Sequence, residues 1–548
     1  MNHPGLAASR HAGLGPENGR IGMITRRAFC TGAGSALMIP AVRSLFPPSL
    51  AQVAQAAGGD VDPCGGYTVS PPEQFLFTDL RHIDVGDLQW MSPEGSPIPV
   101  AGPPEPPVEA RALLGGVPRG IRLVAQPARK EGPIEGLPRS VIHHDGLYRS
   151  WSVSANYPSG ENLGSYSRAA AKSITVRYGE SKDGYSWSFR DASEIEISGQ
   201  TGIDGDGFFI DPHGPEEERY KCVYNAWVLT DNARLWEQYD KIHPRHRDVR
   251  INPDYIYCLF GLVSPDGLNW KRIEEPLLIH KGDTDNTVYY DLWLGKYVLY
   301  TRLYWLRRRM IARAESDDFH HWSPVDPIVQ PSLDDPLSYD VYTNARTSYP
   351  GLPEHHLMFP MYYRRYTQTS EIHLLTSIDG IRWQRLPAGP VLEPGDPGDW
   401  DGEFVVAGKN LVPLGNDRVA IPYSGATHPH KYPRWPGVIQ HGSGWASWPK
   451  GRLAAITADE EGEFHTFGVT VTGEKLAVNA KVRRAGELRV GLSGVEGRSA
   501  ADCDPILGDD LAHPVTWKGD RSLGAAPGST VSLHCKLRAA ELFGFEWV

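Results

Sequence analysis

Ser181-Lys182-Asp183-Gly184-Tyr185-Ser186-Trp187 is one copy of a seven-residue pattern, Ser-x-Asp-Gly-x-x-Trp, that recurs through the middle of the chain. Further copies start at Ser264, Ser316 and Ser377, with Phe319 replacing the Gly of the third. Asp-Gly favours a tight hairpin, because Asp caps its own backbone and Gly accepts a positive φ. A strand-like run of Tyr, Val, Leu and Arg precedes each copy. Hairpins repeated at intervals of tens of residues are typical of propeller blades.

The segments around the repeats fit one register of five blades. In each of the first four blades, three strands precede the hairpin and the Trp of the pattern opens a fourth. The predicted innermost strands are 140–144, 207–210, 286–290, 345–349 and 405–412, and blade five continues with 418–424 and 452–458. The sequence therefore predicts an all-β protein whose residues 139–458 form a five-bladed β-propeller.

The two segments that flank the predicted propeller have different compositions. Residues 57–138 are predicted to be an N-terminal wrapping segment, because 97–138 are rich in Pro, Gly and Glu and lack periodicity, as expected of a loop. Residues 459–548 hold short alternating strands separated by Gly and Asp turns, which predicts a C-terminal β-sandwich.

The N-terminus resembles an export signal. Thr25-Arg26-Arg27-Ala28-Phe29 precedes an apolar stretch over 32–42 and a small-residue site, Ala54-Gln55-Ala56. Residues 1–56 are therefore predicted to be a twin-arginine-type signal peptide, which places the mature protein in the periplasm or outside the cell. The alternative is a stray Arg pair in a leader without function. We expect no membrane span elsewhere.

Net charge and cysteine spacing argue against several classes of binding partner and of active site. The formal net charge of −11 disfavours nucleic acids and anionic membranes. Five cysteines follow the predicted cleavage site, and none has the spacing of a metal site or of a catalytic thiol. Cys503 and Cys535 could pair in an oxidising compartment or be buried as free thiols. No cofactor is predicted.

Several motifs together resemble one family of bacterial proteins. Besides the first hairpin copy, they are Glu218-Arg219-Tyr220-Lys221, Gly295-Lys296-Tyr297-Val298, Asp504-Pro505-Ile506 with Gly508-Asp509, and Val515-Thr516-Trp517. The chain from about Phe75 to Val548 is similar to exported five-bladed propeller proteins related to glycoside hydrolase families 32 and 43, which carry a trailing β-sandwich. This resemblance implies the fold and, less directly, glycosidase activity on a carbohydrate.

The chain departs from those families where their catalytic acids lie. The families carry three acids in motifs such as Asn-Asp-Pro-Asn and Arg-Asp-Pro, and neither motif is intact here. Asp211-Pro212 is similar to the second motif. The register places Asp211 at the far end of an inner strand, so it is interpreted as a turn residue.

The register suggests a different set of acids. If the Asp-Gly hairpins lie on one face, the starts of the inner strands and the ends of the second strands meet on the other, at the expected funnel mouth. The predicted catalytic residues there are Asp204, Asp206, Asp285, Asp401 and Glu403. The predicted substrate-binding residues are Trp227, Arg302, Tyr304, Asn344, Arg364 and His428.

Glycoside hydrolysis requires one protonated and one ionised carboxyl group, about 5 Å apart for retention or about 6.5 to 9.5 Å apart for inversion. Crowded carboxylates raise one another's pKa, which would keep one of them protonated. We assign Asp285 as base or nucleophile, Glu403 as acid and Asp206 as transition-state stabiliser.

Each of these residues also has a simpler interpretation. The acids lie in Gly- and Asp-rich stretches typical of turns, and Ile203-Asp204-Gly205-Asp206-Gly207 is also compatible with a calcium-binding loop. Arg302 and Arg364 could form exposed salt bridges, and neighbours on a strand alternate, so Arg364 and Arg365 cannot both face the mouth. His428 lies in a His-Pro-His loop, and Trp227 could serve packing alone.

Three functions agree with the sequence. The first is an exported glycoside hydrolase, the second a phosphate-dependent glycoside phosphorylase that uses the mouth arginines, and the third a carbohydrate-binding protein without catalysis. The insertion over 230–253 would overhang the mouth or reach a neighbouring subunit, which favours a homo-oligomer.

Overall fold

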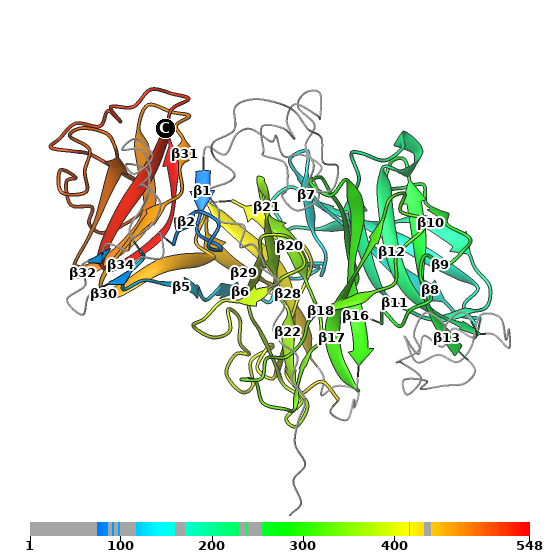
Figure 1. Cartoon of the computed structure of the whole chain (residues 1–548). Coiled ribbons are helices and arrows are strands. Elements are labelled where there is room, and N and C mark those ends of the chain that lie inside the picture. The colour runs from blue at the N-terminus through cyan, green and yellow to red at the C-terminus, as the bar shows by residue number, and fades with distance from the viewer. Residues whose placement is uncertain are drawn as a thin grey trace, which may run out of the picture. The chain divides into compact units, whose positions relative to one another are not determined.

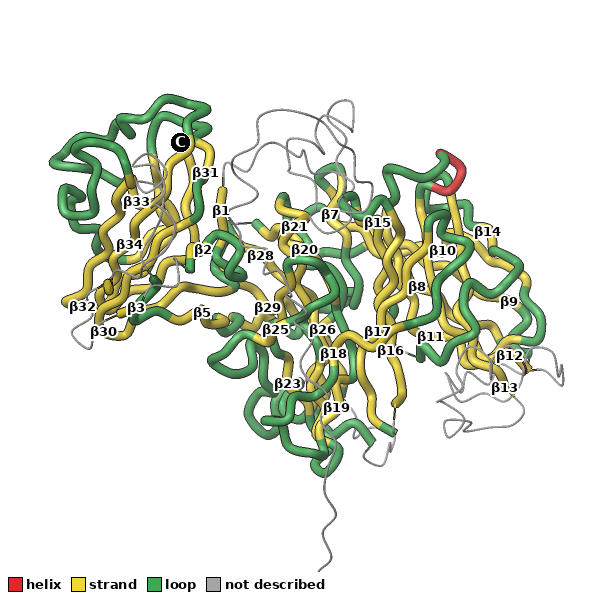
Figure 2. Tube along the Cα trace, viewed as in Figure 1, coloured by secondary structure: helices red, strands yellow, loops and turns green. Residues whose placement is uncertain are grey.

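The computed structural model describes residues 74–85, 90–91, 97–98, 117–158, 170–229, 237, 255–283, 285–305, 307–415, 417–431 and 440–548. Strands dominate these residues, and a short 3-10 turn at Glu216–Glu218 interrupts them (Figure 2). The chain is therefore all-β, as predicted. Over the same ranges, no helix is long and apolar enough to cross a membrane. The predicted signal peptide lies outside the described residues.

The first three blades are antiparallel four-stranded sheets whose strands follow one another in sequence (Figure 1). Blade one holds β7 (Ile142–His144), β8 (Leu147–Asn156), β9 (Ser173–Ser181) and β10 (Ser188–Glu196). Blade two holds β11 (Gln200–Ile210), β12 (Tyr220–Leu229), β13 (Tyr255–Ser264) and β14 (Lys271–Arg272). Blade three holds β15 (Thr287–Asp291), β16 (Lys296–Trp305), β17 (Arg308–Ser316) and β18 (Asp326–Val329).

Blade four is divided along its length into two hydrogen-bonded sheets. One holds β19 (Tyr339–Val341), β22 (Met361–Arg364) and β23 (Ser370–Ile372). The other holds β20 (Arg346–Tyr349), β21 (Leu352–Met358), β24 (Leu375–Ser377) and β25 (Gln384–Arg385). The chain passes back and forth between the two sheets, since β19 is followed by β20 and β21 is followed by β22.

Blade five combines strands from distant parts of the chain. Its inner strand is formed by β26 (Phe404–Ala407) and β27 (Val412–Leu414), followed by β28 (Arg418–Ala426) and β29 (His441–Pro449). The outermost strand is β6 (Arg129–Glu131), which comes from before blade one and pairs antiparallel with β29. The predicted strand over 452–458 differs from this arrangement, because those residues lead into and form β30.

Apolar clusters between neighbouring blades close the ring. Each cluster joins two blades, and together they run from blades one and two round to blades five and one. The last cluster brings Trp445 of blade five against Tyr148 of blade one. Backbone hydrogen bonds reinforce this closure, since the Lys409 N–H donates to the Arg139 carbonyl at 2.7 Å. The five blades therefore form a closed propeller.

The repeated hairpins share most of their internal hydrogen bonds. In the first, Ser181 Oγ accepts the Gly184 N–H at 2.9 Å, and the Trp187 indole donates to the Gly184 carbonyl at 3.2 Å. The third copy keeps the indole bond although Phe319 replaces Gly, with φ at 70°. The Ser186 N–H, followed by the Tyr185 N–H, lowers the pKa of Asp183 to about 2. The motif is thus a local turn device, as predicted.

The C-terminal β-sandwich is built on three long strands, β30 (Ala454–Thr466), β32 (Leu476–Ser493) and β34 (Thr530–Trp547). Bulges within the long strands let them bend around a single apolar core. Shorter strands extend this network: β31 (Val469–Thr470), β33 (Asp509–Pro514), and, from the N-terminal segment, β1 (Gln74–Leu76), β2 (Ile83–Asp84) and β5 (Arg122–Ala125). A separate pair joins β3 (Trp90–Met91) and β4 (Pro97–Ile98).

The N-terminal segment therefore supplies strands to both domains rather than only loops. Cys503 and Cys535 lie buried in the sandwich core as free thiols, which was one of the two predicted alternatives. Cys222 and Cys258 are also free and buried, whereas Cys64 lies outside the described residues.

Candidate active site

Four aspartates, Asp204, Asp206, Asp283 and Asp285, come from the inner-strand segments of blades two and three. Asp204 and Asp206 lie in the middle of β11, and Asp283 and Asp285 lie in the turn that leads into β15. We call these four residues, together with Arg139, Lys281, Arg302 and Tyr304, the axial cluster. The repeated hairpins follow the third strands and so lie on the opposite face, as the register predicted.

Asp283 is held by a buried arginine and a tyrosine from the end of β16. Its Oδ2 accepts a hydrogen bond from Arg302 Nη1 at 2.5 Å and another from the Tyr304 hydroxyl at 3.1 Å. Burial favours the neutral form, but the charges of Arg302 and then Lys281 outweigh it and lower the pKa of Asp283 below its ordinary value. Asp283 is therefore an ionised carboxylate in a fixed position.

Asp204 has the opposite electrostatic environment. Desolvation by the surrounding protein raises its pKa above the ordinary value, and the negative charges of Asp283 and Asp206 raise it further. The Gly205 N–H, which donates to Oδ1 at 2.7 Å, opposes this shift. The side chain is still accessible to solvent, so it can reach a bound molecule. A carboxyl group of this kind tends to keep its proton.

Asp285 is almost completely buried, and its backbone is strained. Its φ is 58°, and that of Asp283 is 53°, values that non-glycine residues seldom adopt. Asp285 Oδ1 lies 3.5 Å from Arg139 Nη2, while Oδ2 is buried and has no hydrogen-bond partner among the described residues. An acceptor left without a donor in this position suits a hydrogen bond from a ligand.

Asn344, a predicted substrate-binding residue, makes hydrogen bonds that fix this turn. Its Nδ2 donates to the Asp285 carbonyl at 2.5 Å, and its Oδ1 accepts the Thr287 hydroxyl at 2.8 Å. Asp206 is similarly engaged, because its Oδ2 accepts the Val153 N–H of blade one at 2.7 Å. The Lys409 ammonium of blade five donates to the Asp206 carbonyl. Both residues therefore tie neighbouring blades together around the cluster.

Cations and aromatic rings surround Asp283. The Lys281 ammonium lies 4.6 Å from the centre of the Tyr257 ring and 4.4 Å from that of Tyr304. The Arg302 guanidinium lies 4.1 Å from the centre of the Tyr342 ring, and its Nη2 is buried without a hydrogen-bond partner among the described residues. Desolvation, assisted by the charges of Arg302 and Arg309, lowers the pKa of Lys281 to about 8, although Asp283 raises it.

A second ion-pair group lies at the start of blade four. Asp340 is fully buried, with Arg309 Nη1 at 2.9 Å and Arg365 Nε at 2.8 Å from its Oδ2. Arg365 thus points toward this group, whereas Arg364 pairs with Glu371 on the neighbouring strand. The two arginines therefore have different partners, although Arg364 ends β22 and Arg365 lies in the turn that follows it.

The other predicted site residues have separate environments. Asp401 is buried between Lys130 of β6, at 2.8 Å, and the Tyr423 hydroxyl, at 2.9 Å. Glu403 forms no hydrogen bond or ion pair through its carboxylate with any described residue, and only its backbone bond to Ala426 fixes it. His428 Nδ1 contacts the Pro429 carbonyl at 2.8 Å.

Trp227, at the end of β12, packs against Tyr255 and Tyr257. Its indole N–H is buried and has no partner among the described residues. The structure thus joins Asp204, Asp206, Asp285, Arg302 and Tyr304 of the predicted set in one cluster, with Asn344 beneath it.

Sequence reasoning did not select Asp283, Lys281 or Arg139. Lys281-Gly282-Asp283-Thr284-Asp285 resembles an ordinary turn, and the two-residue spacing of the aspartates is the one signal that could have linked both carboxylates to one site. Arg139 precedes the first blade, and its approach to Asp285 depends on closure of the ring. Among the described residues, no group of three or more His, Cys, Asp or Glu side chains is arranged to hold a metal ion.

Lys281 gives a testable pH dependence. The unfolded lysine keeps its proton up to about pH 10.5 and the folded one up to about pH 8, so the unfolded state binds more protons between these values. Stability should therefore rise across this window, by roughly 3 kcal/mol when the shift is fully expressed. Denaturant unfolding of wild type and Lys281→Met from pH 7 to 10.5 checks this. Equal slopes in both proteins would show that Lys281 has an ordinary pKa.

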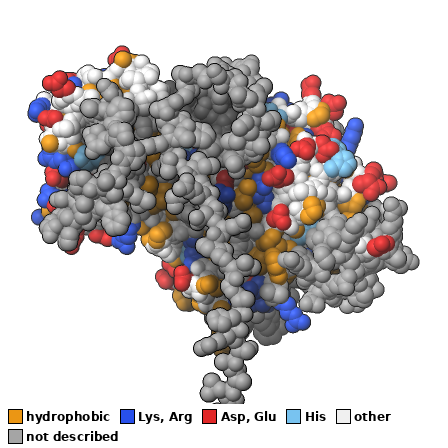
Figure 3. Space-filling model, viewed as in Figure 1, with side chains coloured by type: hydrophobic (Ala, Val, Ile, Leu, Met, Phe, Trp, Pro, Cys, Tyr) orange, Lys and Arg blue, Asp and Glu red, His pale blue; other side chains and the backbone are white. Residues whose placement is uncertain are grey.

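Acidic and basic side chains are both present across the coloured surface in Figure 3.

No protein-family model matches the chain, and no curated protein matches it. Solved structures with a similar backbone include an N-acetylgalactosamine deacetylase from F. plautii in complex with blood group B trisaccharide. It has 13% identity and a TM-score of 0.36, with 60% of this chain and 96% of that chain covered. Bombyx mori GH32 β-fructofuranosidase BmSUC1 has 9% identity and a TM-score of 0.36, covering 79% and 93%.

Exo-inulinase from Aspergillus awamori has 11% identity and a TM-score of 0.36, covering 77% of this chain and 98% of that chain. At these identities and TM-scores the likeness carries no conclusion about activity. The fold follows from the chain's own sheets, and the chemistry has to follow from the axial cluster.

Proposed function

We propose that the protein is a glycoside hydrolase whose axial cluster cleaves a glycosidic bond. The observation that supports this most is a pair of electrostatically coupled carboxyl groups, Asp204 and Asp283, whose pKa values are shifted in opposite directions. Two titratable groups separated in this way are suited to act as acid and as base or nucleophile. Glycoside hydrolysis requires such a pair.

In this proposal, Asp204 is the general acid. Its proton passes to the glycosidic oxygen as the bond to the leaving sugar breaks. Asp283 remains ionised and acts on the sugar carbon, either directly as nucleophile or through a water molecule as base. Arg302 and Tyr304 hold its carboxylate in position, which limits the reorganisation needed during the reaction.

The other members of the cluster would act on the bound sugar. The unpartnered Oδ2 of Asp285 can accept a hydroxyl hydrogen bond, and Asp206 adds negative charge that favours the oxocarbenium-like transition state. Trp227 offers an aromatic surface and a free indole N–H. In this proposal Asp204 takes the acid role that the sequence analysis assigned to Glu403, and His428 stays a predicted binding residue.

A phosphate-dependent variant of the same reaction is the second candidate. The observation that favours it is the buried, unpartnered Nη2 of Arg302, which lies beside the cations Lys281 and Arg309. Phosphate bound there would attack the sugar carbon in place of water, and Asp283 would then need no role as base.

Export and oligomeric state are also part of this proposal. The twin-arginine stretch supports export, which would place the enzyme with extracellular or periplasmic carbohydrate. The insertion over 230–253, on which the predicted homo-oligomer rests, lies outside the described residues except for residue 237.

Product chromatography tests the proposed function. The protein without residues 1–56 is incubated with furanosidic and pyranosidic oligosaccharides, with and without phosphate. Free sugar without phosphate, lost in Asp204→Asn and retained in Asp379→Asn, is the expected result. Asp379 is a matched control because it lies in a hairpin on the opposite face. Sugar phosphate as sole product would establish the second candidate, and binding without any product would overturn both.

A further inference from the structure

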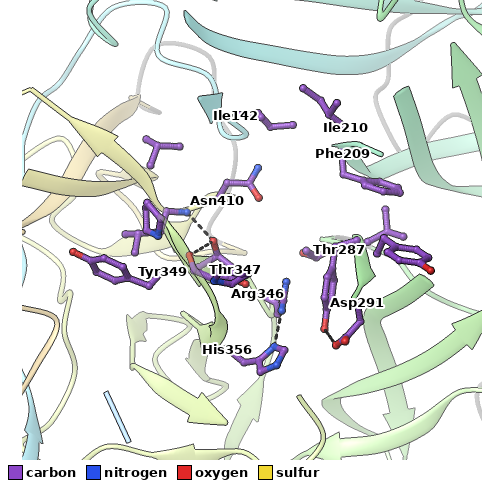
Figure 4. A pocket seen from close by; sticks show the side chains of 18 of the residues that line it. Ile142, Phe209, Ile210, Thr287, Asp291, Arg346, Thr347, Tyr349, His356 and Asn410 are labelled. Carbon is purple, nitrogen blue, oxygen red and sulfur yellow. Dashed lines mark hydrogen bonds between the residues drawn. The ribbon is translucent and has the colours of Figure 1, made fainter. Parts of the chain in front are cut away.

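A second candidate site is a cavity among the inner strands of the propeller. Residues of β7, β11, β15, β20 and β27, with Asn410 and Leu411 before β27, line a cavity of about 130 Å³ (Figure 4). It includes the last residues of β11 and β15, and no member of the axial cluster lines it. About 130 Å³ is close to the volume of cavities that accept one small organic molecule.

Arg346 of β20 brings a positive charge into this cavity. The residue is 4% exposed. Its Nη2 donates to His356 Nδ1 at 2.7 Å, and in Figure 4 the guanidinium extends from this bond into the space between the blades. Its Nε is buried and has no hydrogen-bond partner among the described residues. Part of its donor capacity is thus unused.

No carboxylate of the described residues lies within ion-pair distance of Arg346. His356 does not compensate the charge, because desolvation and then the Arg346 charge lower its pKa well below the ordinary value and keep it neutral. Asp291 also lines the cavity, but its carboxylate is bonded to the Tyr289 hydroxyl at 3.2 Å and to the Trp293 and Leu294 N–H groups at 3.0 Å. The buried guanidinium therefore has no carboxylate in direct contact, because the Asp291 carboxylate in the same cavity is held by other donors.

The residues that line the cavity indicate which kind of ligand could pair with the Arg346 guanidinium. The Arg346 guanidinium stacks 3.4 Å from the centre of the Tyr289 ring, which covers one of its faces. Ile142, Phe209 and Val412 make other parts of the wall apolar. One free guanidinium balances one negative charge, and apolar walls favour a hydrocarbon body over a hydrated dianion such as phosphate.

We propose that this cavity binds a small organic carboxylate, whose carboxyl group pairs with Arg346 and whose apolar part contacts the aromatic walls. The site is separate from the proposed catalytic centre, and occupancy does not depend on what reaction the axial cluster performs.

Thermal unfolding with added anions tests the proposal. Sodium acetate and sodium benzoate are compared with acetamide and benzamide, and with sodium chloride and phosphate at equal ionic strength. The Tm of wild type should rise with the logarithm of carboxylate concentration, as expected for a ligand that binds the folded state. Arg346→Met should weaken this response at least tenfold in concentration. Should that variant fail to fold, Arg346→Gln, which keeps a donor for His356, carries the same expectation.

A matched control is Arg313→Met on the neighbouring blade. Arg313 is also a buried arginine, but it has a carboxylate partner, Glu315, at 2.5 Å. It should keep the wild-type carboxylate response even if its Tm falls. Arg302→Met should also keep it, since that residue belongs to the axial cluster. An equal shift with chloride or phosphate, no shift with either carboxylate, or a shift that survives Arg346→Met would overturn the proposal.

Discussion

Asp283→Asn is expected to lower kcat for glycoside cleavage by about 10³-fold, a typical loss when a positioned acid, base or nucleophile is removed. The amide cannot carry the negative charge that Arg302 and Tyr304 hold in place, and it is neither base nor nucleophile. KM should change much less, because the amide keeps a similar shape. Initial rates over a range of concentrations of the substrate identified by product chromatography measure both constants.

The same substitution leaves the Arg302 charge with a weaker partner, so its effect on folding must be separated from its effect on chemistry. Asp283→Glu keeps a carboxylate for Arg302 but displaces it by one methylene. We expect this variant to retain most of the wild-type stability and to lose most of the activity. Activity near that of wild type in folded Asp283→Asn would show that another carboxylate carries the reaction.

Asp204 provides an independent check on the acid. Its raised pKa places the loss of its proton above the usual range for an aspartate, so wild-type activity should fall as pH rises through that pKa. Asp204→Asn should remove this limb of the profile along with most of the activity. Activated substrates, whose leaving groups need no proton, should be affected less.

Local features of the sequence were sufficient for most of the propeller. The four hairpins depend on bonds within a few residues, such as Trp187 to Gly184, so the pattern alone located them. The outermost strand of blade five could not be found in this way. It comes from Arg129–Glu131, and its pairing with β29 joins segments far apart in the chain. No periodicity in so short a strand reveals its partner.

In the candidate site, too, the sequence predicted what depends on local register and missed what depends on long-range contacts. Asp204, Asp206 and Asp285 followed from the register, which places inner-strand starts on one face. Asp401 satisfied the same rule, yet Lys130 of β6 and Tyr423 hold it within blade five. Since β6 was not foreseen, neither was its lysine. Asp283 was not selected from the sequence, because the side chains that bind its carboxylate, Arg302 and Tyr304, come from the end of a different strand.

Asp211→Asn is expected to destabilise the protein by about 3 to 5 kcal/mol without changing kcat, the usual cost of breaking a buried ion pair by removing one partner. Asp211 and Lys221 are both fully buried, with Lys221 Nζ 2.9 Å from Asp211 Oδ2. The Tyr297 hydroxyl donates to the same oxygen at 2.7 Å. Urea unfolding measures the loss, and rates per folded molecule measure kcat.

The double variant Asp211→Asn with Lys221→Met separates the ion pair from the packing. Once the lysine charge is also gone, no uncompensated charge remains, and much of the lost stability should return. Asp211 is also where the chain comes nearest to the Arg-Asp-Pro motif of the families it resembles. If Asp211→Asn instead abolished activity and left stability unchanged, the resemblance would have located a catalytic acid that the ion pair with Lys221 does not explain. The reacting centre would then lie at the C-terminal end of β11, on the face of the hairpins, and not at the axial cluster.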